Sequence, residues 1–253
     1  MVDNIANKKI LFVTGGTGGH IFPALSTYEI LKKISSNIAF ATDKWGFKNK
    51  ELSMFKPFLI HSVGFEGKGL LFKFYSLIIL SIAILKALVF LKKENIRIVL
   101  GFGSYVQVPF VIAALLLKRD VVLHEANAVI GKANKIFWKY VSIRTSAFYL
   151  GKKFQNTNII GMPVRKKVLQ LYRKEYKAPQ KKDKINILIL GGSLGASSLS
   201  YQLCKCITFL PYEIKKRLVV THQVKPDELA LVEKAYKKAN IKFIVDTFIK
   251  DIS

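Results

Sequence analysis

Short apolar runs alternate along this chain with longer segments of helical type. The runs that we predict as strands are Lys9–Thr14, Asn37–Thr42, Phe58–Val63, Arg97–Leu100, Asp120–His124, Ile143–Ala147 and Thr157–Ile160. Helices are predicted near residues 22–33, 70–93, 105–118 and 131–140. This alternation is typical of a parallel sheet with helices on both faces, and such sheets bind ligands at the carboxyl ends of their strands.

A composition break separates this pattern from a second one. The segment Arg165–Lys184 holds nine Lys and Arg residues against two acidic ones, and it contains Pro179. Strands then follow at Ile185–Leu190, Lys216–Thr221 and Lys242–Val245, with helices ending near Leu210 and running near 226–239. We therefore predict an α/β protein with two doubly wound, Rossmann-like domains, at 1–163 and 185–253, joined by a linker at 164–184. The second domain is expected to be incomplete.

Each predicted domain begins with a strand, a glycine loop and a helix. The first loop, Thr14–His20, has four glycines in seven residues, and the second, Gly191–Ala196, reads GGSLGA. Glycine lets backbone N–H groups approach an anion, and a helix N-terminus adds positive potential. The first loop matches neither the dinucleotide nor the Walker spacing. It predicts a phosphate site, and the alternative is a tight strand-to-helix connection.

The charge balance favours an anionic partner. The chain has 41 Lys and Arg residues against 16 Asp and Glu, a formal net charge of +25. Nucleic acid, anionic lipid and a phosphorylated substrate all fit this balance, as does a general bias toward lysine on solvated surfaces. The sequence carries no recognisable RNA-binding, zinc-finger or helix-turn-helix signature, so we expect no nucleic acid partner.

The cysteines indicate neither a disulfide nor a metal site. Cys204 and Cys206 lie two apart on a predicted helix and therefore point to different faces. The sequence has no Asp-x-Asp motif, and we expect no bound metal and no cofactor. The first residues, MVDNIANKK, lack the apolar segment of a signal peptide, which favours a cytosolic location.

The segment Leu70–Leu91 is apolar almost all round. A membrane-spanning helix needs about 20 apolar residues, and Lys73 and Lys86 leave only twelve uncharged positions between them. We expect a helix that either packs on the sheet or lies at a membrane surface. Together with Lys68, Lys73 and the positive net charge of the chain, its apolar surface favours contact with an anionic bilayer.

Several motifs occur in one order: TGGTGGHIFPAL, GFGSYVQVP, HEANAVIGKANK, GMPVR, ILGGSLGA and DTFIKDI. Over residues 8–252 the chain resembles the MurG family of peptidoglycan N-acetylglucosaminyltransferases. The resemblance implies a GT-B fold and transfer of N-acetylglucosamine from UDP-N-acetylglucosamine to lipid I, an undecaprenyl-diphosphate-linked muramoylpentapeptide, which gives lipid II. It implies inverting direct displacement, and a peripheral location on the cytoplasmic side of the inner membrane, whose surface is anionic.

The resemblance also implies roles for particular residues. His20 is the expected catalytic base or a ligand of the acceptor diphosphate, and Glu125 is the rival base. Tyr105 matches an acceptor-side residue, and Ile249 matches a position at the uracil pocket. The residues expected to contact the donor are Thr17, Gly18, Gly19, Asn127, Arg165 and Ser193.

The chain departs from the family pattern in two ways. Ser104, Ala126 and Met162 stand where the family usually has glycine, glutamine and asparagine. We expect Ala126 to remove a polar side chain from the edge of the cleft. The family's second domain also continues past the position matched by Ser253. The alternative function is therefore a non-catalytic remnant that binds lipid diphosphate or membrane only.

Overall fold

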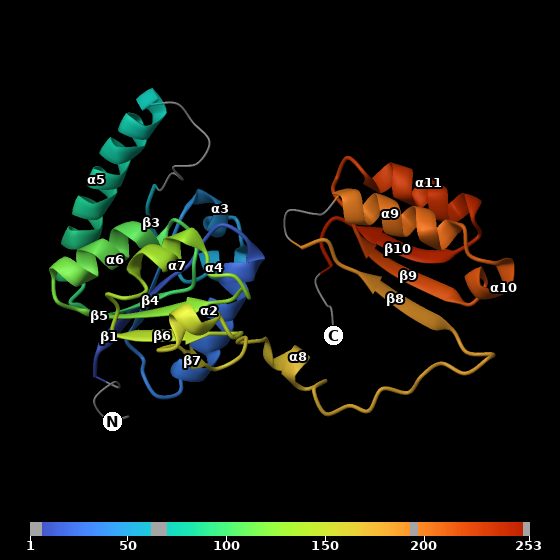
Figure 1. Cartoon of the computed structure of the whole chain (residues 1–253), viewed down its shortest axis with the longest axis horizontal. Helices are drawn as coiled ribbons and strands as arrows, with labels where there is room; N and C mark the ends of the chain where they lie inside the picture. Colours follow the sequence, from blue (N-terminus) through green and yellow to red (C-terminus); the bar gives the residue numbers. More distant parts are fainter. Residues whose placement is uncertain (1–6, 62–69, 193–196, 250–253) are drawn as a thin grey trace. The chain divides into compact units, whose positions relative to one another are not determined.

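The chain forms two compact units, Met1–Lys166 and Lys167–Ser253 (Figure 1). The structure is a computed structural model, and it describes residues 7–61, 70–192 and 197–249. Each unit holds one parallel sheet and is described here by itself.

Within the described residues, the first unit is built on seven parallel strands. Their bounds are β1 Lys9–Val13, β2 Ile38–Thr42, β3 Phe58–Leu59, β4 Ile96–Gly101, β5 Asp120–Glu125, β6 Ile143–Ser146 and β7 Asn158–Ile159. In the order β3-β2-β1-β4-β5-β6-β7, the direction of winding reverses between β1 and β4. The predicted doubly wound sheet is therefore confirmed. The predicted end of the third strand, Val63, lies outside the described residues.

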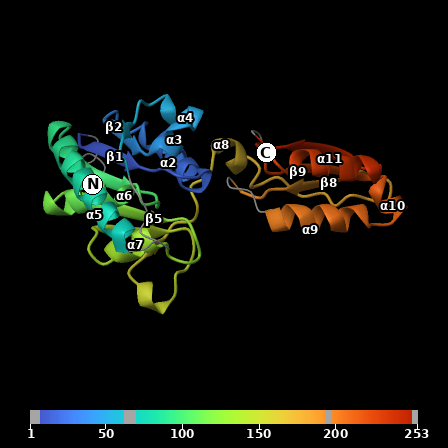
Figure 2. The ribbon, with the colours of Figure 1, turned by 90° about the horizontal axis from the view of Figure 1, so that it is seen from above.

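Alternate residues of β1 face two different cores. Ile10 and Phe12 pack in a cluster with residues of α2 (Gly18–Leu31), whereas Leu11 and Val13 belong to the core formed with α5 (Leu70–Lys93), α6 (Gln107–Leu116) and α7 (Lys132–Phe137). Figure 1 shows α5, α6 and α7 above the strands and α2 below them, and Figure 2 looks down onto the side of α5, α6 and α7. The minor helices are α3 (Lys44–Phe47), α4 (Lys50–Ser53), α8 (Lys166–Leu169) and a 3-10 turn at Lys152–Phe154. The first sheet is thus covered on both faces, as predicted.

Helix α5 packs on the unit through a narrow stripe. Ser76, Ala83, Ala87 and Leu91 are buried, and their spacing places them on one face of the helix. The opposite face exposes large apolar side chains, including Leu77 (56% exposed) and Leu85 (63%). Within the described residues, one helical segment, Phe74–Lys93, is long and apolar enough to cross a membrane by length and composition, and 22% of its most apolar window is buried.

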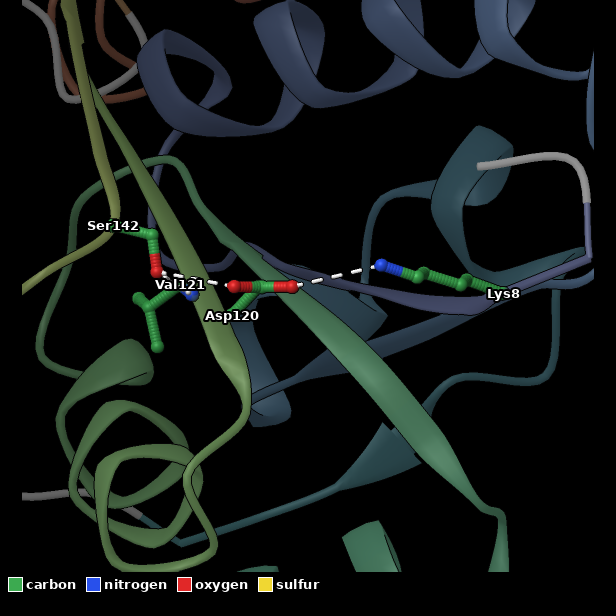
Figure 3. A network of polar contacts seen from close by, with 4 residues as sticks. All are labelled: Lys8, Asp120, Val121 and Ser142. Carbon is green, nitrogen blue, oxygen red and sulfur yellow. Dashed lines mark hydrogen bonds and ion pairs between the residues drawn. The ribbon is translucent and has the colours of Figure 1, made fainter. Parts of the chain in front are cut away.

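A small polar network lies at the amino end of β5 (Figure 3). The Asp120 carboxylate lies 3.8 Å from Lys8 Nζ and accepts a hydrogen bond from the Ser142 hydroxyl at 3.4 Å. That hydroxyl in turn accepts from the Val121 N–H at 3.2 Å. The network connects three separate stretches of the chain at the amino ends of the strands, opposite the carboxyl ends.

In the part of the second unit that the structure describes there are three parallel strands, β8 (Ile185–Ile189), β9 (Leu218–Gln223) and β10 (Lys242–Asp246), in the order β10-β9-β8. Its helices are α9 (Ser197–Thr208), α10 (Tyr212–Lys215) and α11 (Leu229–Lys238). Alternate strand residues join one core with α9 and α11, where Cys204 is buried while Cys206 is exposed, as predicted. Leu188 and Ile244 remain exposed, so one face of this sheet is uncovered within the described residues, as expected for an incomplete second domain.

Candidate functional site

A cavity of about 290 Å³ opens at the carboxyl ends of β1, β4 and β5, next to the point where the sheet reverses its winding. Ligands of doubly wound sheets bind at this position. The cavity is lined by His20, Gly103, Ser104, Tyr105, Glu125, Asn127, Gly131, Lys132, Ala133 and Asn134. Four of the predicted site residues, His20, Tyr105, Glu125 and Asn127, therefore meet in one place.

A larger cavity of about 500 Å³ lies at the amino ends of the strands, where Lys8, Lys9 and Arg97 are among its lining residues. The two acidic groups in it are already paired with lysines: Asp120 with Lys8 and Glu94 with Lys9. Because parallel sheets bind ligands at the opposite edge, we take the smaller cavity as the candidate site.

The glycine loop enters α2 earlier than predicted, because the helix begins at Gly18 rather than near residue 22. Gly16 has a φ of +71°, in the left-handed region that glycine adopts without strain. Its N–H donates to the Asp43 carboxylate at 3.2 Å, and the same oxygen accepts from the Gly46 N–H at 2.7 Å. A carboxylate thus stands beside the first half of the loop, so an anionic ligand would meet the turn at Thr17–Gly19.

His20 lies in the first turn of α2, half-buried in the cavity wall. Its Nδ1 is 2.8 Å from the backbone carbonyl oxygen of Phe102. A carbonyl oxygen only accepts hydrogen bonds, so Nδ1 must carry the proton in this contact. In the neutral ring Nε2 then bears the lone pair, which is the form of a general base.

Glu125 is only 2% exposed and its carboxylate accepts four hydrogen bonds. One oxygen accepts from the backbone N–H and the side-chain amide of Asn127, both at 2.9 Å. The other accepts from the Gly131 N–H and the Asn134 side-chain amide, both at 2.8 Å. With both oxygens occupied by protein donors, Glu125 anchors the turn that carries Asn127.

The neighbouring His124 is buried behind the cavity. Its Nδ1 lies 3.1 Å from the Thr145 hydroxyl, which itself donates to the Leu123 carbonyl oxygen. Burial lowers the pKa of His124. This ring therefore belongs to the core of the sheet rather than to the site.

The remaining predicted site residues lie elsewhere. The Arg165 guanidinium stacks over the Phe22 ring of α2, 4.6 Å from its centroid, outside the cavity. Ile249 follows β10 in the second unit and is half-buried, and Ser193 lies outside the described residues. Thr17, Gly18 and Gly19 form the turn that leads into His20.

The three residues that depart from the family pattern differ in burial. Ser104 lines the cavity and has a φ of +69°. Ala126 is buried and is not among the lining residues, so the expectation that it alters the edge of the cleft is not met. Met162 is exposed.

Two buried residues of this region were not predicted from the sequence: Asn134, which lines the cavity, and Gln107, which does not. The signal available for Gln107 was a lone polar residue at the start of an otherwise apolar helix. Among the described residues, no group of three or more His, Cys, Asp or Glu side chains is placed to hold a metal ion.

Comparison of the sequence with known proteins finds glycosyltransferases. Residues 10–144 match the model of the glycosyltransferase family 28 N-terminal domain. A protein from Gluconobacter oxydans, named UDP-N-acetylglucosamine–N-acetylmuramyl-(pentapeptide) pyrophosphoryl-undecaprenol N-acetylglucosamine transferase, is 32% identical over 97% of this chain and 69% of its own length. A Francisella philomiragia protein of the same name is 35% identical over 99% of this chain and 68% of its own length.

Among solved structures, the crystal structure of Acinetobacter baumannii MurG aligns with a TM-score of 0.65 and 26% identity. The alignment covers 96% of this chain and 68% of that one. The chain thus spans about two thirds of the length of the relatives it matches.

Proposed function

This chain belongs to glycosyltransferase family 28 and to its MurG branch, with a GT-B type fold, and on this premise we propose that it transfers N-acetylglucosamine from UDP-N-acetylglucosamine to lipid I, giving lipid II. The observation that carries the proposal is the setting of His20. Its ring is fixed through Nδ1, which leaves Nε2 as the lone-pair nitrogen, in a cavity at the reversal point of the sheet.

In the proposed reaction, His20 Nε2 accepts the proton of the acceptor hydroxyl as that oxygen attacks the anomeric carbon of N-acetylglucosamine. The new C–O bond forms on the face opposite the bond to UDP, whose electron pair leaves with the diphosphate, so the anomeric centre inverts. The turn at Thr17, Gly18 and Gly19, at the start of α2, offers positive potential to a diphosphate. Removal of the proton by a positioned base lowers the barrier to attack.

Glu125 acts in this scheme as a positioning residue for Asn127. Its oxygens already accept four hydrogen bonds from the protein, so His20 is the better base of the two candidates. Asn127 then offers amide contacts to sugar hydroxyls, and Tyr105 offers an aromatic wall on the acceptor side.

The donor-side roles rest on the resemblance to the family. Arg165 is proposed to bind the donor diphosphate, Ser193 to contact the donor from the second glycine loop, and Ile249 to line the uracil pocket. A guanidinium suits a diphosphate because it donates several hydrogen bonds in a planar fork.

We further propose that the first unit binds the cytoplasmic face of the anionic inner membrane through α5. The exposed face of this helix includes Leu77, Leu85 and Val89, and Lys86 and Lys93 are exposed on the same helix. Apolar side chains flanked by lysines are the composition that favours the interface of an anionic bilayer. The acceptor carries its own lipid, so a site near the membrane is chemically appropriate.

The alternative function, binding of lipid diphosphate or membrane without turnover, is favoured by one observation. One face of the three-stranded sheet in the second unit leaves Leu188 and Ile244 exposed, and this unit is the one expected to hold the donor. A sheet with one uncovered face makes a less complete wall for a UDP-sugar.

The deciding experiment measures transfer of labelled N-acetylglucosamine from UDP-N-acetylglucosamine to a lipid I analogue, with the 253-residue chain. We expect turnover that falls about 100-fold or more in His20→Ala, the scale of general base catalysis. The matched control is His61→Ala, because His61 is exposed and does not line the cavity. Circular dichroism checks that both variants fold.

Unchanged turnover in His20→Ala would remove this residue from the mechanism. A folded wild-type chain that binds vesicles containing the lipid I analogue but transfers no sugar would favour the binding function.

A further inference from the structure

One backbone peptide group lies between His20 and a buried glutamine. The carbonyl oxygen of Phe102 accepts from His20 Nδ1 at 2.8 Å. The N–H of Gly103, in the same peptide group, donates to Gln107 Oε1 at 2.9 Å. Because a peptide group is planar and rigid, a bond on its N–H side also fixes the direction of its carbonyl. Gln107 therefore sets the oxygen that holds the His20 ring.

The chain of hydrogen bonds continues from Gln107 to the opposite wall of the cavity. Gln107 Nε2 donates to Asn134 Oδ1 at 2.6 Å, and Asn134 Nδ2 donates to Glu125 at 2.8 Å. Gln107, Asn134 and Glu125 are 0%, 1% and 2% exposed. Each amide is oriented by its neighbours: Gly103 offers only a donor, and the Glu125 carboxylate is an acceptor. Donation along this buried chain therefore runs in one direction, from His20 to Glu125.

Two glycines of the GFG sequence make room for this arrangement. A Cβ on Gly101 would lie 2.4 Å from Gln107 Oε1 and 2.7 Å from a Leu123 methyl carbon. A Cβ on Gly103, whose φ is +95°, would lie 2.7 Å from His20 Nδ1. Real side chains do not approach so closely, so the backbone is shaped around Gln107 on one side and His20 on the other.

From this geometry we propose that Gln107 is a positioning residue that holds His20 in its Nδ1-protonated tautomer and joins its orientation to the Glu125–Asn127 turn. The proposal deepens the function given above, since it concerns the residue assigned there as the base. Without the Gln107 oxygen, the permissive backbone at Gly103 is free to rotate. A rotated peptide would turn its N–H toward His20 Nδ1 and favour the tautomer with the proton on Nε2, which is the wrong one for a base.

The test uses the full chain, labelled with 15N in its four histidines, and reads the tautomer of His20 from its ring nitrogen shifts. The His20→Ala spectrum assigns the signals. We expect the Nδ1–H tautomer in the wild-type chain and a mixture with the Nε2–H tautomer in Gln107→Leu. In Gln107→Glu we expect the wild-type tautomer, because a carboxyl group in either protonation state still has an oxygen that accepts from Gly103.

The control for loss of packing is Val111→Ala, on the same helix. Val111 is fully buried and apolar, and takes no part in the hydrogen-bond chain. We expect Val111→Ala to lower the melting temperature and to leave the tautomer unchanged. Should Gln107→Leu fail to fold, Asn134→Leu breaks the chain one bond further away and is expected to give a smaller change of the same kind.

In the transfer assay, Gln107→Leu is expected to lower kcat about ten- to a hundredfold, the effect of a misplaced catalytic group. We expect KM for the UDP-sugar to stay within about twofold, because Gln107 does not touch the cavity. A wild-type tautomer in Gln107→Leu, the same tautomer change in Val111→Ala, or a shifted tautomer with unchanged kcat would each overturn the proposal. The tautomer measurement needs no turnover, so a chain without transfer activity would still test the role of Gln107.

Discussion

At the scale of single residues, backbone conformation explains more of the site than residue type does. Ser104 has a φ of +69° beside the cavity, next to Gly103 at +95°. The left-handed region costs an L residue about 1–2 kcal/mol, and glycine adopts it freely. The resemblance to the family predicted glycine at this position, and the structure provides a physical reason for that preference.

We expect Ser104→Gly to stabilise the first unit by about 0.5–1 kcal/mol, because relief of strain exceeds the added entropy of the unfolded chain. Thermal unfolding followed by tryptophan fluorescence measures this, since both tryptophans, Trp45 and Trp138, lie in the first unit. The midpoint should rise by about 1–4 °C.

The matched control is Ser81→Gly, in the exposed part of helix α5. There the backbone is helical, so glycine relieves no strain. It adds an entropic cost of about 0.5–1 kcal/mol and removes the exposed hydrogen bond from the Ser81 hydroxyl to the Leu77 carbonyl, and both effects are destabilising. A fall of the midpoint in both variants would show that Ser104 is not strained.

The sequence could predict which residues meet in the cavity but not how they are held. His20, Tyr105, Glu125 and Asn127 each follow a predicted strand, and the carboxyl ends of parallel strands share one edge. The role of Gln107 depends on the positive φ of Gly103 and on the direction of one peptide group. No spacing rule contains that information.

At the scale of elements, α5 shows the limit of pattern analysis most clearly. The sequence indicated an apolar helix at 70–93 and left open whether it packs on the sheet or lies on a membrane. Three of its four buried positions among the described side chains, Ser76, Ala83 and Ala87, are small residues among larger apolar ones. A hydropathy pattern ranks the larger residues as core, whereas the structure exposes them because the close approach of α5 to α6 requires small side chains.

We expect the double variant Leu77→Asp and Leu85→Asp to weaken binding to vesicles that contain phosphatidylglycerol. Each substitution places a charge on the exposed apolar face of α5, where contact with a bilayer would have to dehydrate it. Flotation with liposomes measures the bound fraction, which should fall about tenfold or more. The reason is that insertion of two leucine side chains into the bilayer contributes several kcal/mol to binding.

The control carries the same change of charge on the second unit: Phe209→Asp and Leu231→Asp, both at exposed apolar positions. It should bind as the wild type does if α5 is the contact. Equal loss of binding in both double variants would mean that net charge alone, rather than the face of α5, decides the association.

At the scale of the whole molecule, the two units differ in how completely they bury their sheets. Among the described residues, the first unit has apolar clusters on both faces of its seven strands, whereas the second has one cluster on one face of its three strands. The sequence predicted two Rossmann-like folds from two similar strand–loop–helix beginnings. The uneven coverage was expected because the second domain is incomplete, and it could not be read from periodicity, because the strand Ile185–Leu190 is apolar at every position except Asn186.

This difference predicts that the second unit unfolds at a lower urea concentration than the first, because stability grows with the apolar surface buried. Two probes separate the units. Tryptophan fluorescence follows the first unit alone, since Trp45 and Trp138 both lie there. Cys204 follows the second unit: it is buried in the core beside α11, and burial raises the pKa of its thiol, so it reacts slowly with a thiol reagent while the unit is folded.

Cys206 is exposed, so the experiment uses a Cys206→Ser variant in which Cys204 is the sole thiol. Labelling of Cys204 should become fast at urea concentrations where the tryptophan signal is still native. Each unit has its own hydrophobic clusters, and separate cores unfold separately unless an extensive interface joins them. Coincident transitions would show that the units stabilise one another. In that case the exposed strand face of the second unit would not lower its stability on its own, and the case for a weak donor wall would lose its physical basis.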